Sequence, residues 1–435
     1  MKHNSAGSKT RDFWKEPHAV LASEIIKKKL DAGPTVFLKQ VYPARIVCLG
    51  IWVRVGSIYE NEKNAGLSHF VEHMLFRSTE NRGVGQIAKE IQSLGGYLNG
   101  FTSWETTCYW MVLPSKYLEY ALEIQADAVL HPLFLPEEVE KESDVICEEI
   151  HMGDDRPEHF IFEKLLNNSY KIHPYRRPVI GYEKVVRGIT PENLFRHHQK
   201  YYHSGNIFLV MVGDLDIPKA INWSEKYFAG IRKGRKSPLP KVKEPTLDGP
   251  VHVNYTGDIR NAYIALSFRI PEFGHPDIYA CDLLANLLAE GKTSRLQKSL
   301  VEKKGLVARI DAGIISGTGP GLLVLDALLS PAKIEKAIHE IYNEFHLLLE
   351  KGISDEELQK AKNQAESYYV LNQETVEGQM RNIGHYEILG DYRMAEDYVI
   401  QLKKVTREDI ISVAKKYLRP ENSCDVTYHP ERGKS

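Results

Sequence analysis

The stretch LSHFVEHMLF, residues 67–76, carries the most informative pattern in the chain. In a helix, His69 and His73 lie four residues apart, and therefore on one face and about one turn from each other. Two imidazoles placed in this way can bind one zinc ion, because each nitrogen must approach the metal to roughly 2.0–2.1 Å. Glu72 lies close to the same face, within reach of a water molecule at the metal. The order His-x-x-Glu-His is the reverse of the commoner His-Glu-x-x-His.

The same residues also fit an amphipathic helix with two exposed histidines. The apolar residues around the pattern favour burial instead: Leu67, Phe70, Val71, Met74, Leu75 and Phe76. Buried imidazoles and carboxylates need partners, and a metal ion is the simplest common partner for two histidines and a glutamate. A catalytic zinc takes three protein ligands, so this interpretation requires a third.

The stretch LPEEVEKESDVICEEIHM, residues 135–152, is the best source of that ligand. Pro136 followed by two glutamates indicates the start of a helix. Glu142 and Glu149 are seven residues apart, which puts them on one helix face two turns apart. An exposed acidic helix is the alternative, and spacing alone does not separate Glu142 from Glu149 as the ligand.

Length and composition indicate an ordinary globular protein. The chain has 435 residues, enough for two domains or more, with 43% hydrophobic and 26% charged residues. A net charge of −2 gives no reason to expect nucleic acid or an anionic membrane as a partner. We expect a cytoplasmic protein, because no apolar run reaches the length of a membrane helix and the first 20 residues lack the apolar region of a secretory signal.

The chain contains an internal duplication. Residues 114–149 and residues 331–366 both open with proline and an amphipathic helix, and both continue through a short loop into an acidic helix start. Upstream, residues 35–57 match residues 251–272 in kind, since both are rich in alternating β-forming residues and precede a helix. In the second copy the histidine positions fall near Asn286 and Glu290, so we expect no metal site there.

The duplication predicts two related α+β domains, residues 1–235 with the metal site and residues 236–435 without one. The joint is expected within RKGRKSPLPKVKEPTLDGP, residues 232–250, which is rich in Pro, Gly and Lys and lacks periodicity. Strands and helices do not alternate strictly, which favours a mostly antiparallel sheet with helices packed on one face in each domain.

The sequence resembles the M16 metallopeptidases, the family of pitrilysin and the mitochondrial processing peptidase, and among them the shorter bacterial M16B members. The resemblance covers nearly the whole chain and rests on motifs in the expected order: GLSHFVEHMLF (66–76), IQSLGGYLNGFTSWETTCYW (91–110), EKESDVICEEIHM (140–152), RRPVIGYEKVVRGITPENLFRHHQKYY (176–202) and NIFLVMVGDLD (206–216). It implies two homologous domains that enclose a chamber, with zinc on the N-terminal wall.

By this resemblance, His69, His73 and Glu149 bind one zinc ion per chain, Glu72 is the catalytic base, and Glu142 supports the site from behind. The segment 95–110 follows a helix that ends at two glycines, and its Thr, Tyr, Trp and Phe residues predict a strand. That strand is either an edge strand that pairs with an extended peptide or an ordinary core strand. By resemblance, Asn99 contacts the substrate, and Gly100 stands where the family usually has alanine.

The second half departs from the family pattern. Active members usually carry an Arg and a Tyr seven residues apart, which bind substrate carbonyls from the far wall. In LVEKKGLVA, residues 300–308, Val301 and Ala308 occupy those two positions, and neither side chain can donate a hydrogen bond. We therefore expect the chain to be the zinc-bearing subunit of a heterodimer whose homologous M16B partner supplies the Arg/Tyr pair, or otherwise a homodimer.

The function expected from the sequence is a zinc metalloendopeptidase that hydrolyses peptides or extended segments. One alternative is a maturation protease dedicated to a single precursor peptide. Another is a non-catalytic assembly subunit, which the set of His69, Glu72, His73 and Glu149 argues against because a scaffold needs no base.

Overall fold

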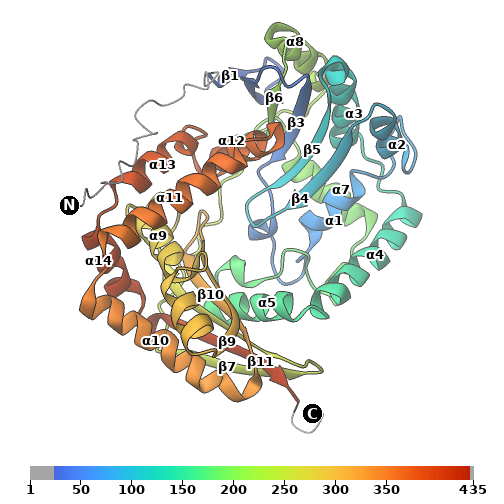
Figure 1. Ribbon diagram of the computed structural model, residues 1–435. Helices are drawn as coiled ribbons and strands as arrows, with labels where there is room; N and C mark the ends of the chain where they lie inside the picture. Colours follow the sequence, from blue (N-terminus) through green and yellow to red (C-terminus); the bar gives the residue numbers. More distant parts are fainter. Residues whose placement is uncertain (1–23, 432–435) are drawn as a thin grey trace, which may run out of the picture.

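The computed structural model describes residues 24–431, which form two mixed sheets and the helices around them (Figure 1). The start of the chain, in which we predicted no secretory signal, lies outside the described residues. Within the described range, no helix combines the length and the apolar character needed to cross a bilayer.

The first sheet has six strands in the order β1-β2-β6-β3-β5-β4. Their bounds are Ile26–Lys29 (β1), Thr35–Gln40 (β2), Ile46–Val53 (β3), Tyr97–Thr102 (β4), Thr107–Pro114 (β5) and Ile207–Gly213 (β6). The helices of this half are Leu67–Met74 (α1), Gln86–Ser93 (α2), Leu118–Leu130 (α3), Pro136–Asp154 (α4), Pro157–Ser169 (α5), Glu183–Val186 (α6), Pro191–Tyr201 (α7) and Ile217–Phe228 (α8).

The second sheet has five strands in the order β7-β11-β8-β10-β9. Their bounds are Val251–Gly257 (β7), Ala262–Ile270 (β8), Val307–Ile315 (β9), Gly321–Leu329 (β10) and Ser423–Pro430 (β11). The helices of this half are Ile278–Ala289 (α9), Ile334–Lys351 (α10), Asp355–Asn372 (α11), Val376–Leu389 (α12), Met394–Lys404 (α13) and Arg407–Tyr417 (α14).

The two sheets repeat one topology, as the duplication predicted. Each contains one parallel pair, β2 with β6 and β7 with β11, and all other pairs are antiparallel. The helix pair α3 and α4 corresponds in order to α10 and α11. The expected α+β class with two related, mostly antiparallel sheets is therefore confirmed. The domain boundary near residue 235 stays a prediction.

The structure adds an exchange of helices between the halves. Met380 and Ile383 of α12 pack with Trp52 and Phe208 on the face of the first sheet that its own helices leave open. Leu165 and other residues of α5 pack in the same way on the second sheet. Figure 1 shows α12 lying across the first sheet and α5 beside the second. Each sheet is thus covered on one face by its own half and on the other face by a helix of the opposite half.

The segment 95–110, for which we predicted one strand, forms a hairpin. β4 is the edge strand of the first sheet, and β5 is a buried strand beside it. The turn between them is closed by a hydrogen bond from the backbone N–H of Ser103 to the carbonyl oxygen of Thr106, at 2.8 Å. The edge-strand alternative therefore describes β4, and the core-strand alternative describes β5.

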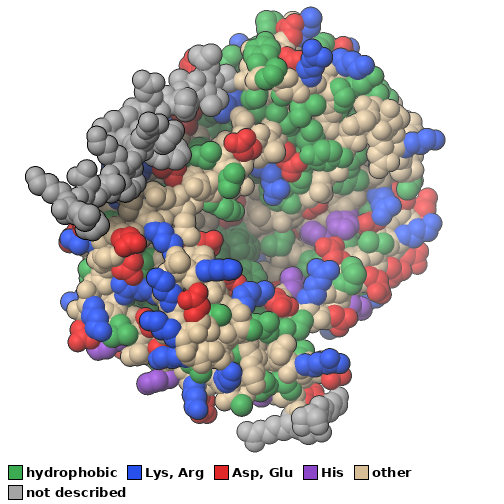
Figure 2. Space-filling model, viewed as in Figure 1, with side chains coloured by type: hydrophobic (Ala, Val, Ile, Leu, Met, Phe, Trp, Pro, Cys, Tyr) green, Lys and Arg blue, Asp and Glu red, His purple; other side chains and the backbone are tan. Residues whose placement is uncertain are grey.

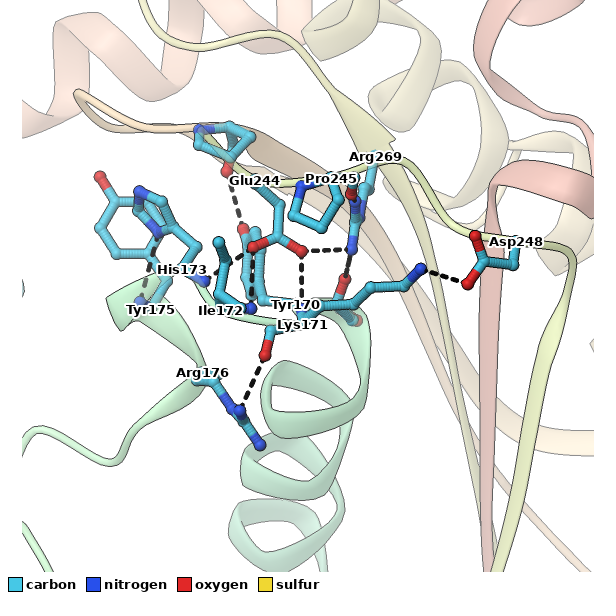
Figure 3. Close-up of polar contacts among 12 residues, drawn as sticks. Tyr170, Lys171, Ile172, His173, Tyr175, Arg176, Glu244, Pro245, Asp248 and Arg269 are labelled. Carbon is cyan, nitrogen blue, oxygen red and sulfur yellow. Dashed lines mark hydrogen bonds and ion pairs between the residues drawn. The ribbon is translucent and has the colours of Figure 1, made fainter. Parts of the chain in front are cut away.

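The expected linker, residues 232–250, contains neither helix nor strand and is held in place by Glu244 (Figure 3). The carboxylate accepts hydrogen bonds from the backbone N–H groups of Lys171 (2.6 Å), Ile172 (3.0 Å) and His173 (2.7 Å). Arg269 of β8 donates to it from the second half at 2.8 Å. Burial opposes ionisation of Glu244, but these four donors outweigh it and hold its pKa below the ordinary value.

We expect Glu244→Gln to lower the free energy of unfolding by about 2 kcal/mol at neutral pH, because an amide nitrogen would then face backbone donors in a site that is only 3% exposed. Because the pKa of Glu244 is lower in the folded state than in the unfolded state, its carboxylate stabilises the fold fully above the unfolded-state pKa, near 4.5. This stabilisation is lost as the pH falls from that value through the lowered folded-state pKa. Denaturant unfolding at pH 7 and pH 4 measures the difference, which should shrink at the lower pH. Asp248→Asn, which removes only the exposed ion pair with Lys171, is the control and should change stability by less than about 0.5 kcal/mol.

Candidate metal centre

Helix α1 is fixed at its N-terminus and along its buried face. Glu60 accepts hydrogen bonds from the backbone N–H groups of Gly66 (2.8 Å) and Ser68 (2.6 Å), which satisfies donors that a helix start leaves free. Phe70 and Val71 are fully buried in the first core. With this face buried, the opposite face of α1 turns toward α4 and β4, where the histidines lie.

His69, His73 and Glu149 come together between α1 and α4, and they are the one group of potential metal ligands found within the described residues. The Nε2 atoms of His69 and His73 lie 3.9 Å and 3.6 Å from Oε2 of Glu149. These distances are too long for hydrogen bonds, yet close to the roughly 3.3 Å that separates donors bound at 2.0–2.1 Å to one tetrahedral ion. Figure 2 shows a hollow between the two halves, with histidine side chains on the wall of the first half.

His69 has the character of a neutral ligand. Burial, assisted by the neighbouring His73, lowers the pKa of His69 to about 3. Its buried Nδ1 has no hydrogen-bond partner among the described residues. The ring therefore carries an uncharged nitrogen toward Glu149, and a zinc ion fits this donor set of two imidazoles and a carboxylate.

His73 is held by a second carboxylate, that of Glu142. Its Nδ1 lies 2.8 Å from Oε1 of Glu142, and Arg77 forms an ion pair with the other oxygen of that carboxylate. Burial opposes the charged form of His73, but the hydrogen bond to Glu142 and the nearby carboxylates outweigh it and raise its pKa. In Glu142 the bond from His73 and the charge of Arg77 likewise overcome burial and lower the pKa. An ionised Glu142 accepts the Nδ1 proton and leaves Nε2 free for a metal.

Glu72 lies between the histidines and the edge strand. Burial raises its pKa, against the opposing effect of a hydrogen bond from the Thr102 hydroxyl, at 2.6 Å. Gly100 of β4 allows this approach, because a Cβ at that position would lie 2.8 Å from Oε1 of Glu72. The carboxylate of Glu72 is thus placed beside the edge strand β4.

Asn99 lies on the same strand but on its other face. Side chains alternate along a strand, and Gly100 and Thr102 occupy the face toward Glu72. The side-chain oxygen of Asn99 accepts the N–H of Gly100 at 2.8 Å. The structure therefore places Asn99 on the strand beside Glu72, with its side chain on the opposite face and outside the group of potential ligands.

Comparison with known proteins assigns the fold and the family. Residues 35–183 match the model described as insulinase, peptidase family M16, and residues 188–365 match the model described as the peptidase M16 inactive domain. The chain belongs to the M16 peptidase family. It is 31% identical to an uncharacterized zinc protease of Rickettsia felis over 89% of this chain and 93% of that protein. It is 27% identical to the zinc protease PqqE of Helicobacter pylori over 88% of each.

A solved structure supports the same assignment. A protease from Helicobacter pylori superposes with a TM-score of 0.89 at 26% identity, over 94% of this chain and all of that one. A solved structure described as a peptidase M16 inactive domain, from Pseudomonas fluorescens, shares the fold, with a TM-score of 0.84 at 20% identity over 94% of this chain and 99% of that one. The resemblance to M16 stated from the sequence is therefore confirmed.

Val301 and Ala308, the two positions that the resemblance assigned to donors for substrate carbonyls, lie in the second half, and neither side chain is a hydrogen-bond donor. Val301 belongs to a π-helical segment, Gln297–Lys303, and Ala308 is exposed on β9. Two arginines nearby are paired with acids of their own: Arg295 with Glu357, and Arg309 with Asp311 and Asp326.

Sequence reasoning missed two residues that hold the centre in this M16 chain. Arg77 lies three residues beyond the end of α1 and pairs with Glu142, and Thr102 follows Gly100 by two on β4, so strand alternation places its hydroxyl on the face toward Glu72. Neither was selected, because an arginine after a helix and a threonine in a strand are ordinary residues without a partner in view.

We expect Glu149→Gln to lose zinc, because a neutral amide replaces the charged oxygen that faces the Nε2 atoms of both histidines. We expect Glu142→Gln to weaken zinc binding about 10–100-fold, because the carboxylate that accepts the Nδ1 proton of His73 is removed. Zinc content after dialysis and competition with a chelating dye measure both effects. Glu148→Gln changes the exposed neighbour of Glu149 and should keep full zinc content. Equal zinc affinity in all three variants would contradict this centre.

Proposed function

We propose that this chain is a zinc endopeptidase that hydrolyses peptides or extended protein segments, with one zinc ion per chain. The observation that carries the proposal is that ligand atoms of His69, His73 and Glu149 lie within 4.8 Å of one another, with Glu72 on the helix that carries both histidines. The relatives named as zinc proteases support both the metal and the class of reaction.

The roles of the residues follow from their positions. His69, His73 and Glu149 would hold the ion, and a bound zinc supplies Lewis-acid polarisation of the scissile carbonyl and of the attacking water. Glu72 accepts the proton of that water and returns it to the leaving amine. Burial, which raises the pKa of Glu72, strengthens it as a base, and the hydroxyl of Thr102 fixes its direction.

The edge strand β4 is the proposed seat of the substrate backbone. It ends the sheet, and no described strand pairs with the backbone N–H and C=O groups on its outer side. An extended peptide can add to such an edge as a further strand. Because Gly100 and Thr102 lie beside Glu72, a peptide paired here would pass the proposed base.

We further propose that the chain works as the zinc-bearing subunit of a heterodimer with a homologous M16 partner. Val301 and Ala308 provide no hydrogen-bond donor where active members of the family hold substrate carbonyls. Arg295 and Arg309, the arginines closest to these positions in the sequence, are paired with carboxylates of their own half. A partner that carries the Arg/Tyr pair would supply the missing donors.

We expect Glu72→Gln to lower peptide hydrolysis by about 10²–10⁴-fold while zinc content stays at the wild-type level, because the amide cannot accept the proton of water. Cleavage of an unstructured fluorogenic peptide and metal analysis of the same preparation measure the two effects. Glu140→Gln, an exposed residue of α4, is the matched control and should leave both unchanged. Wild-type turnover in Glu72→Gln would remove Glu72 from its proposed role.

For the subunit proposal, we expect the chain purified alone to cleave the unstructured peptide slowly, and the chain purified with a homologue that carries the Arg/Tyr pair to cleave it at least tenfold faster. Size-exclusion chromatography of the mixture should show a complex. Full activity of the chain alone would exclude a required partner while leaving the peptidase proposal intact.

A further inference from the structure

The edge strand β4 has a second face, which the proposed reaction does not use. Tyr97 and Phe101 project from this face, opposite to Gly100 and Thr102. There they contact α12, the helix contributed by the second half. The hydroxyl of Tyr97 donates a hydrogen bond to Oε2 of Glu377 at 2.7 Å, and the ring of Phe101 lies under Arg381.

Arg381 is held in place by aromatic rings rather than by hydrogen bonds. Its guanidinium carbon lies 5.1 Å from the ring centre of Phe101 on β4 and 5.2 Å from that of Trp110 on β5. Phe101 and Trp110 are themselves packed against each other, with ring centres 5.9 Å apart. Contacts of a cation with two ring faces restrict the guanidinium and leave its N–H groups available.

Those N–H groups have no hydrogen-bond acceptor within residues 24–431. Arg381 forms an ion pair with Glu377 at 3.7 Å, which is longer than a hydrogen bond, and its side chain is 50% exposed. The other carboxylate oxygen of Glu377 is already engaged by Tyr97. Arg381 is therefore a restricted, accessible cation with free donors beside an open strand edge.

A peptide that pairs with β4 presents its side chains to both faces in turn. The two residues that flank the scissile bond point in opposite directions, one toward α1 and the other toward α12. A peptide side chain on the α12 side lies next to the β4 side chains of the same face. Arg381 covers one of these, Phe101, and is therefore within reach of the peptide side chain. The guanidinium fork fits a carboxylate through two parallel N–H bonds, and few other side chains match it.

We propose that Arg381 binds the carboxylate of an Asp or Glu side chain in the peptide, at the residue beside the scissile bond that faces α12. This inference rests on the proposed pairing of the peptide with β4. It makes Arg381 a specificity residue, because it touches a substrate side chain and takes no part in bond cleavage. The predicted substrates are peptides with an acidic residue at that position.

The test compares peptides that differ only by Glu or Gln, with the residue placed in turn at each position around the cleavage site. Binding is measured by fluorescence anisotropy on the zinc-loaded full chain with Glu72→Gln, which should bind peptide without consuming it. We expect the Glu peptide to bind about five- to tenfold more tightly than the Gln peptide when the residue stands beside the scissile bond on the α12 side, and equally tightly when it stands on the other side of that bond. In Arg381→Gln the two peptides should bind equally.

Two further variants separate recognition from packing. Arg381→Glu should prefer a Lys peptide, a reversal of sign that lost packing alone would not produce. Glu377→Gln removes the competing carboxylate and should increase the preference for Glu. Unchanged zinc content in all variants shows that the fold is kept.

The outcomes of the test are distinct. Equal binding of Glu and Gln peptides by the chain with Arg381 intact, or a preference that persists in Arg381→Gln, overturns the inference, while continued cleavage by the wild-type chain keeps the proposed function. If no peptide is bound or cleaved, either by the chain alone or by the chain together with a homologue that carries the Arg/Tyr pair, the proposed function fails and the inference fails with it. A preference that Arg381→Gln abolishes and Arg381→Glu reverses establishes the site.

Discussion

A sheet buried on both faces needs apolar cover on both, and this chain meets the requirement by exchanging helices between its halves. Helix α12 supplies Met380 and Ile383 to the first sheet, and α5 supplies Leu165 to the second. Each buried side chain of this size contributes about 1.5–3 kcal/mol, so separating the halves would expose several such residues at once. The exchange therefore fixes the two halves relative to each other, while the linker, bound through Glu244, follows their surface.

The repeated pattern of strands and helices could be predicted from the sequence, but the exchange could not. Periodicity identifies an apolar face on a helix and says nothing about which sheet that face will meet. Trp52 and Met380 are in contact at 3.3 Å although 328 residues separate them. The hairpin of β4 and β5 was missed for a local reason, since the turn Ser103-Trp104-Glu105-Thr106 contains no Gly, Pro or Asn. Without one of these residues to indicate a turn, the sequence pattern predicts a single strand across the segment.

Much of the candidate centre could be predicted because helix spacing is itself geometric. The four-residue interval of His69 and His73 ensures that the two rings are neighbours, and the structure has their centres 4.6 Å apart. Spacing could not separate Glu142 from Glu149, because a seven-residue interval puts both on one face. The crossing of α1 and α4 separates them: Glu142 meets the Nδ1 side of His73 together with Arg77, whereas Glu149 meets the Nε2 atoms of both histidines. That crossing depends on tertiary packing, which no local pattern in the sequence contains.

The position of α12 separates two tasks that a peptidase must perform on the same peptide. Donors that hold substrate carbonyls act on the backbone, which is the same in every peptide, and Val301 and Ala308 cannot provide them. In the proposed peptide site, Arg381 would act on a side chain, and it belongs to the same chain as the candidate metal ligands because the helix exchange brings it beside β4. In the proposed heterodimer, the partner would then raise the rate for all peptides by a similar factor. The choice among peptides would remain with the chain that carries the zinc, since its second half reaches across to the strand edge through α12.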